Sequence, residues 1–169
     1  MVFFLTLPFI RSAENAYFSL KEPFFSSPLV QSHGLLLRND AYGKGYFGAS
    51  RSGGRRPHEG IDLVAEEGAP VLAAKSGRIL FSGDRKGYGK SIDIRHSRGY
   101  VTRYAHLSLL NVKEGEWIRK GALIGNTGKS GNASRPNILP HLHFEIQFNK
   151  KPVNPSKGYL DPAIQILNK

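Results

Sequence analysis

Short segments of this chain alternate strictly between apolar and polar side chains, and glycine-rich turns separate them. Successive side chains of a β-strand point to opposite faces of a sheet, so a period of two residues indicates strands. The pattern predicts strands at residues 58–64, 70–82, 90–96, 100–107, 117–124 and 141–148. The sequence also predicts one or two helical turns at residues 161–167, with Pro162 at the first position. We therefore predict an all-β fold with little helix.

The chain has 169 residues, which is the size of one ordinary domain with a core of its own. Residues 1–37 have little pattern, and we expect them to form an N-terminal segment before a folded domain at residues 38–169. Residues 1–10 are almost wholly apolar but too few to span a bilayer. They read either as the core of a secretory signal or as an arm packed on the domain.

The chain is strongly basic, with 24 Lys and Arg against 13 Asp and Glu, a formal charge of +11. Such a charge attracts polyanions, among them an anionic cell wall or membrane surface and nucleic acid. No nucleic-acid-binding motif accompanies the charge, so no nucleic-acid partner is expected. The absence of cysteine excludes disulfides, a thiol nucleophile and a zinc site made of thiolates. A zinc site in this chain must use histidines and carboxylates, which suits catalysis better than structure.

Two histidines stand two positions apart in the last predicted strand, residues 141–148. On a strand, Leu142, Phe144 and Ile146 share one face, and His141, His143 and Glu145 share the other. A lone histidine on a strand is most often structural. Two of them opposite an apolar face are a better candidate for a metal-binding or catalytic surface.

The first predicted strand places a histidine and an aspartate on one face. His58, Gly60 and Asp62 point one way, while Ile61 and Leu63 point the other. Gly60 leaves room between the two polar side chains, where a metal ion fits. Taken alone, the pair also fits an exposed turn with a His–Asp hydrogen bond.

A fifth polar residue ends the strand predicted at residues 100–107. The alternation places Thr102, Tyr104 and His106 on one face, opposite Val101 and Leu107. Catalytic zinc takes three protein ligands and keeps a position open for water. Hydrolysis also needs a group that accepts a proton and one that stabilises the oxyanion. The chain offers a complete set for this chemistry, with ligands His58, Asp62 and His143 and proton-transfer groups His106 and His141.

Three segments that carry these residues resemble the signature blocks of the lysostaphin/LytM-type zinc metallopeptidases: R-P-H-E-G-I-D-L, Y-A-H-L and P-H-L-H-F-E-I. The resemblance covers residues 38–148. It implies a mainly antiparallel sandwich- or barrel-like β-domain with a groove across one sheet. It also implies a zinc-dependent peptidoglycan endopeptidase that acts outside the cytoplasm. Carried over by motif, His58, Asp62 and His143 are the zinc ligands, and His106 and His141 are catalytic.

Alternative functions stay open at this stage. The same family contains catalytically silent members that bind the wall or regulate amidases, although this chain keeps all five residues. A basic β-barrel that binds nucleic acid is suggested by the charge alone. The bond that is cut is also open, because glycine crossbridges and D-alanyl–diaminopimelate links both suit the family. Residues 128–140 form a longer loop than is usual in the family, and we expect this loop to border the groove.

Overall fold

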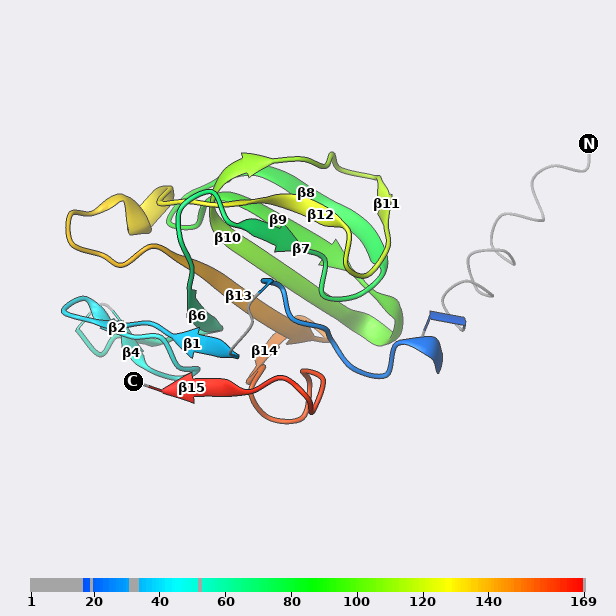
Figure 1. The fold of residues 1–169 in the computed structure, drawn as a ribbon, viewed down its shortest axis with the longest axis horizontal. Helices are drawn as coiled ribbons and strands as arrows, with labels where there is room; N and C mark the ends of the chain where they lie inside the picture. Colours follow the sequence, from blue (N-terminus) through cyan, green and yellow to red (C-terminus); the bar gives the residue numbers. More distant parts are fainter. Residues whose placement is uncertain (1–16, 19, 31–33, 52, 169) are drawn as a thin grey trace, which may run out of the picture.

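One large curved sheet dominates the computed structural model, which describes residues 17–18, 20–30, 34–51 and 53–168 (Figure 1). Its strands follow the order β11-β8-β9-β10-β13-β6-β1-β15, with β7, β12 and β14 attached to this path. These strands are β1 (Leu35–Leu37), β6 (Ile61–Val64), β7 (Pro70–Leu72), β8 (Gly77–Arg85), β9 (Gly89–Arg95), β10 (Tyr100–Leu110), β11 (Trp117–Ile118), β12 (Leu123–Thr127), β13 (His141–Phe148), β14 (Lys151–Val153) and β15 (Ile166–Asn168).

Smaller elements complete the fold. Two short hairpins are formed by β2 (Asn39–Asp40) with β3 (Gly43–Lys44) and by β4 (Ser50–Arg51) with β5 (Arg56–Pro57), and two 3-10 turns are η1 (Ser97–Gly99) and η2 (Gly131–Ser134). The pairings between named strands are antiparallel, except that β1 and β15 run parallel. The predicted all-β, mainly antiparallel fold with little helix is confirmed.

Two predicted strands are each divided in the structure. The segment predicted at residues 70–82 contains β7 and the beginning of β8, because residues 73–76 turn between them. The segment predicted at 117–124 contains β11 and the beginning of β12. Gly121 separates these two with a φ of +80°, a left-handed conformation that interrupts a strand.

The predicted helical turns at residues 161–167 are wrong. The chain makes a single turn in which the backbone N–H of Ala163 donates to the side chain of Asp161, at 2.9 Å. It then enters β15, which pairs with β1 so that Leu35 lies opposite Ile166. Pairing with a sheet edge satisfies backbone groups that a short isolated helix would leave to water, so tertiary context overrides the local preference.

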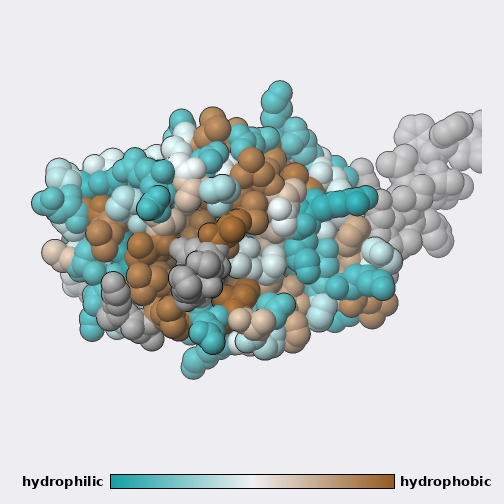
Figure 2. Space-filling view, in the orientation of Figure 1, coloured by the Kyte–Doolittle hydropathy of each residue, from teal (hydrophilic) through white to brown (hydrophobic). Residues whose placement is uncertain are grey.

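The core lies against one face of β13. Leu142, Phe144 and Ile146 are all fully buried, as their alternation predicted. The ring of Phe144 packs 5.3 Å from that of Tyr104 on β10. The same core includes Val71 of β7 and Ile124 of β12, together with further residues of β8 and β9. Figure 2 shows hydrophobic residues gathered towards the middle of one face of the molecule and hydrophilic residues around its edge.

The segment before residue 38 also contributes to this core. Phe25 and Leu29 are only 2% and 3% exposed, and both belong to the core cluster. The carboxylate of Glu22 accepts hydrogen bonds from the backbone and hydroxyl of Ser76, at 2.8 and 2.6 Å. The apolar residues 1–10, read above as a signal or an arm, lie outside the described residues. In the described part of the chain, no helix has both the length and the apolar character needed to span a bilayer.

Candidate metal centre and active site

Three predicted ligands meet where β6 pairs with β13. The register places Asp62 directly opposite His143, and His58 lies four residues before Asp62. Asp62 Oδ1 lies 3.0 Å from His58 Nε2 and 2.9 Å from His143 Nδ1, and the two nitrogens are 3.0 Å apart. All three side chains are buried. The structure thus brings together the three residues that the sequence predicted as a metal site.

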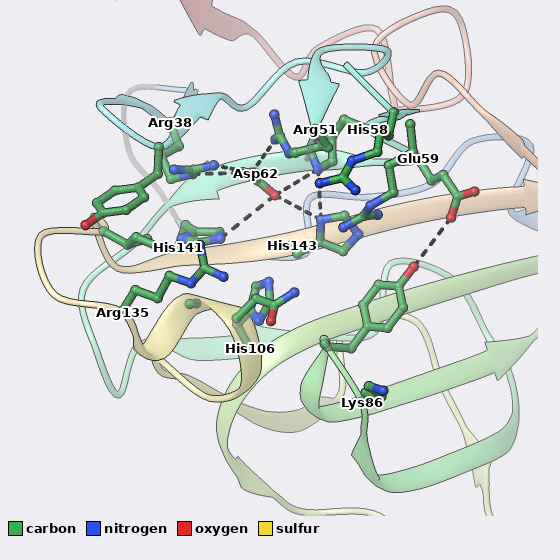
Figure 3. A pocket seen from close by; sticks show the side chains of 18 residues that line it. Arg38, Arg51, His58, Glu59, Asp62, Lys86, His106, Arg135, His141 and His143 are labelled. Carbon is green, nitrogen blue, oxygen red and sulfur yellow. Dashed lines mark hydrogen bonds and ion pairs between the residues drawn. The ribbon is translucent and has the colours of Figure 1, made fainter. Parts of the chain in front are cut away.

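The second oxygen of Asp62 is held by two arginines. Arg38 Nη2 and Arg51 Nη2 both lie 2.9 Å from Asp62 Oδ2 (Figure 3). This arrangement points Oδ1 at the histidines. Burial raises the pKa of Asp62, but its close interactions with His143 and His58 outweigh burial and hold that pKa well below its usual range. The carboxylate is therefore ionised, as a metal ligand must be.

Hydrogen bonds also fix which nitrogen each ligand histidine presents. His58 Nδ1 lies 3.0 Å from the carbonyl oxygen of Tyr46, which can only accept, so Nδ1 donates and Nε2 is left with its lone pair. His143 Nε2 lies 2.9 Å from Glu145 Oε1, so Nε2 donates and Nδ1 faces the cluster. Such outer partners orient metal-binding imidazoles in many proteins.

Glu145 is itself anchored by a network that sequence reasoning missed. Tyr88 donates to Oε1 at 2.8 Å, and Arg103 contacts Oε2 at 3.1 Å. Burial raises the pKa of Glu145, but the hydrogen bond from His143 and the nearby positive charges lower it to about 2. Arg103 also pairs with Asp93 through two hydrogen bonds of 2.9 and 3.0 Å. The only sequence signal for this role was that Glu145 shares the polar face of His143.

His106 reaches the site in a way that simple alternation does not allow. The prediction that Thr102 and Tyr104 share its polar face is wrong, because Tyr104 is fully buried against Phe144 in the core. The register between β10 and β9 shifts between Tyr104 and Leu107, and His106 has a φ of +64° within this bulge. A bulge adds one residue and redirects a side chain. Consequently His106 turns to the side of His143, and their rings lie 5.9 Å apart.

The two predicted catalytic histidines lie next to each other. The rings of His106 and His141 are 5.0 Å apart. His106 Nδ1 donates to the carbonyl of Ser130 at 2.9 Å, and His141 Nδ1 donates to that of Leu139 at 2.7 Å. Both Nε2 atoms are therefore left as proton acceptors. Burial, and then the charges of His143 and His141, lower the pKa of His106 to about 3, and burial also lowers the pKa of His141.

These side chains line a cavity of about 530 Å³. The loop of residues 128–140 borders it through Asn132, Ala133, Arg135 and Ile138, as the family resemblance implied. The same loop supplies the two carbonyls that hold His106 and His141. Figure 3 shows these imidazoles and those of the metal cluster converging from β13, β10 and the segment before β6.

The cluster of His58, Asp62 and His143 suits a divalent cation. Its donors are two imidazole nitrogens and a carboxylate oxygen, which are the ligand types of catalytic zinc. Burial lowers the pKa of His143, but its hydrogen bonds with Asp62 and Glu145 outweigh burial and raise that pKa to about 9. The site therefore favours a positive charge at this point.

The part of the chain that carries this site matches a known protein family. The model of peptidase family M23 matches residues 56–155, which include all five site residues. The chain belongs to peptidase family M23. The matched part of this M23 domain begins at β5 and ends just after β14, so it contains both strands that carry the metal cluster.

Several curated relatives are larger proteins that contain a similar M23 domain. DD-carboxypeptidase/endopeptidase Mpg of Neisseria meningitidis serogroup B is 45% identical over 100 residues, which are 59% of this chain and 22% of Mpg. Murein hydrolase activator NlpD of Escherichia coli K12 is 36% identical over 110 residues, which are 64% of this chain and 27% of NlpD. The matched part of the chain thus spans about a quarter of the length of these relatives.

Solved structures share the fold of the M23 domain. A zinc containing peptidase from Vibrio cholerae is 29% identical and superposes with a TM-score of 0.65, covering 82% of this chain and 41% of that one. The catalytic domain of lysostaphin, an antimicrobial peptidase from Staphylococcus simulans, is 32% identical with a TM-score of 0.56. It covers 69% of this chain and 88% of its own.

Proposed function

We propose that this M23 domain is an active zinc-dependent endopeptidase that hydrolyses peptide cross-links of bacterial peptidoglycan. The observation that carries the proposal is the convergence of His58, Asp62 and His143 within 3.0 Å, beside two neutral imidazoles. This is the inventory that hydrolysis requires: a cation site, a proton acceptor and a group that stabilises negative charge.

His58, Asp62 and His143 would hold the zinc ion. Bound zinc supplies a Lewis acid and makes water more acidic, which favours attack on a peptide carbonyl near neutral pH. Arg38 and Arg51 hold the carboxylate of Asp62 in place through Oδ2, and Glu145 keeps the imidazole of His143 in the ligand tautomer.

His106 and His141 would move the protons. Each has a buried imidazole with Nδ1 held by a backbone carbonyl and Nε2 available as an acceptor. Such a group can accept the proton of the attacking water, and its protonated form can donate to the oxyanion or to the leaving amine. The low pKa values of both histidines keep them in the accepting, neutral form at neutral pH.

The relatives support a cell-wall substrate and a place of action outside the cytoplasm. Mpg is described as a carboxypeptidase and endopeptidase, and NlpD as a murein hydrolase activator. The similarity to NlpD also favours a second candidate, a regulator that activates another wall hydrolase. The five site residues of this chain support turnover by the chain itself, and the basic charge supports attraction to an anionic wall.

Three substitutions test the proposal. We expect His106→Ala and His141→Ala to keep zinc and fold but to lose activity on purified peptidoglycan, by about 10²–10⁴-fold for a general acid–base group. Asp62→Ala should lose both zinc and activity, because the cluster has no second carboxylate to replace it. Elemental zinc content, turnover and melting temperature are measured on the same preparations, with His96→Gln as a control histidine outside the site.

The outcomes separate the two candidates. Full zinc occupancy in the Asp62 variant would refute the ligand assignment. Near wild-type turnover in the His106 or His141 variant would remove that residue from the mechanism. If the wild-type chain cuts no wall peptide but increases the activity of an added amidase, the regulator is the correct function.

A further inference from the structure

Positive charge surrounds the cavity more densely than the chemistry needs. Among the described residues that line it, six are Arg or Lys and two are carboxylates. Arg38 and Arg51 are used inside the site, since both pair with Asp62. The other four cations, which include Arg56, Lys86 and Arg135, lie at the rim of the cavity.

Three rim cations form no ion pair within the described part of the chain: Arg56, Lys86 and Arg135. All three are exposed. Arg56 lies on β5, two residues before His58, and Lys86 lies in the turn between β8 and β9, two residues before Tyr88. Exposed cations without ion pairs could lie anywhere on the surface of the domain. In this fold all three line the same cavity.

Arg135 connects the rim to the catalytic groups. It follows η2 in the loop whose carbonyls, from Ser130 and Leu139, orient the two catalytic histidines. In the view of Figure 3, Arg135 and Lys86 lie on either side of His106. A substrate that enters the cavity to reach the imidazoles therefore meets both cations in its lining.

We propose that the rim of Arg56, Lys86 and Arg135 selects peptides that carry free carboxylates near the scissile bond. This inference rests on the proposed function and narrows its substrate class. Guanidinium and ammonium groups bind carboxylates through charge-assisted hydrogen bonds. A neutral bridge made of glycine leaves these charges without a partner, so it gains nothing from the rim.

The cavity strengthens this selection. The excess of positive charge around one opening raises the local concentration of an entering anion. Glu59 is the only exposed carboxylate among the described lining residues. Its Oε2 atom lies 3.5 Å from the hydroxyl of Tyr88, at the upper limit of a hydrogen bond. The opening is thus attractive to anionic peptides and offers little repulsion to them.

Two matched substrates test the inference. One is a cross-linked muropeptide dimer with free peptide carboxylates, and the other is the same dimer with those carboxylates converted to carboxamides. We expect wild-type kcat/KM to be at least about tenfold higher for the acid form, because several cations act together. Each of Arg56→Gln and Arg135→Gln should reduce that preference by roughly threefold to tenfold, as expected for partly exposed charge pairs.

The control variant is Arg119→Gln. It removes the same charge from an exposed position between β11 and β12, outside the cavity lining, and should leave the preference unchanged. Equal reduction by Arg119→Gln would show that net charge acts, and would overturn the assignment to the rim. Melting temperatures of all three variants should match the wild type, because the substituted side chains are exposed.

The remaining outcomes separate this inference from the proposed function. Equal cleavage of both dimers by wild-type protein overturns the inference and leaves the endopeptidase in place. If neither dimer is cut, calorimetric binding to the His106→Ala variant decides: preferential binding of the acid form supports the rim site although the endopeptidase fails. If inorganic phosphate alone binds there and the carboxylates make no difference, the rim is a phosphate site and the inference is wrong.

Discussion

Among the five site residues, only His106 has a left-handed backbone conformation, with a φ of +64°. For a residue with a side chain, this region costs on the order of 1–2 kcal/mol. Two hydrogen bonds offset the cost, from the backbone N–H of His106 to the carbonyl of Tyr88 and from Nδ1 to that of Ser130, both 2.9 Å. Strain of this kind is common where a side chain must be aimed precisely at a reaction centre.

Another buried histidine, outside the site, contributes to the response of the fold to acid. His96 is buried between the carbonyl of Ser76 and the hydroxyl of Thr102, and burial lowers its pKa from 6.5 to about 4. The unfolded chain therefore binds more protons between these pH values, and stability falls as the pH is lowered through them. We expect His96 to account for about 3 kcal/mol of lost stability between pH 6.5 and 4.

Urea unfolding at several pH values measures this effect. The His96→Gln variant, which cannot be protonated in this range, should show a shallower decline of stability below pH 6.5. It should also be less stable at pH 7, because the glutamine replaces two well-placed hydrogen bonds imperfectly. An unchanged pH slope in the variant would mean that other groups control acid unfolding.

At the scale of elements, the metal cluster depends on how closely the chain before β6 approaches β13. A Cβ atom at Gly60 would lie 2.4 Å from the carbonyl oxygen of Phe144 and 2.9 Å from Cγ of Glu145. Gly60→Ala must therefore push His58 and Asp62 away from His143. We expect zinc affinity to fall by about 10–100-fold, as when outer partners of a metal site are disturbed.

Competition with a chelator of known affinity measures the loss. Gly83→Ala on β8 is the matched control, because its Cβ would meet only the ring of Phe81 at 3.3 Å, far along the chain from the cluster. Zinc affinity should be unchanged in that variant. Wild-type zinc affinity in Gly60→Ala would show that β6 tolerates displacement and that the close approach has no role in the site.

At the scale of the whole molecule, the question is how much the residues before Arg38 contribute to the stability of the domain. The sequence predicts that residues 1–37 precede the folded domain, and no site residue precedes Arg38. Phe25 and Leu29, however, are packed in the core. We expect removal of residues 1–21 to change the melting temperature little. Removal of residues 1–34 should lower it by on the order of 10 °C, since each lost core side chain costs about 2–5 kcal/mol.

Differential scanning calorimetry compares the two truncations with the full chain. Phe25→Ala in the full chain is the matched control and should reproduce part of the loss. Turnover per folded molecule, measured well below the melting temperature, tests dispensability for chemistry separately. A chain starting at Leu35 with the full melting temperature would show that residues 22–29 add nothing to the core.

Much of the candidate site was predictable because it depends on local rules. Alternation in β13 correctly placed Leu142, Phe144 and Ile146 in the core, and thereby His141 and His143 on the opposite face. The same rule paired His58 with Asp62 across Gly60. Strand boundaries were less predictable, because the divisions after β7 and after β11 depend on turns and pairing partners rather than on the alternation itself.

The sequence by itself determined the strand period, the donor types of a cysteine-free metal site and the motif order of an M23 domain, since these follow from side-chain chemistry and spacing. Only the tertiary structure decided that Arg38 and Arg51 hold Asp62, and that a bulge in β10 turns His106 from the core side to the site. The reason is physical. Partners far apart in the chain meet only through strand pairing, and a bulge is selected by the hydrogen bonds of neighbouring segments rather than by the residues within it.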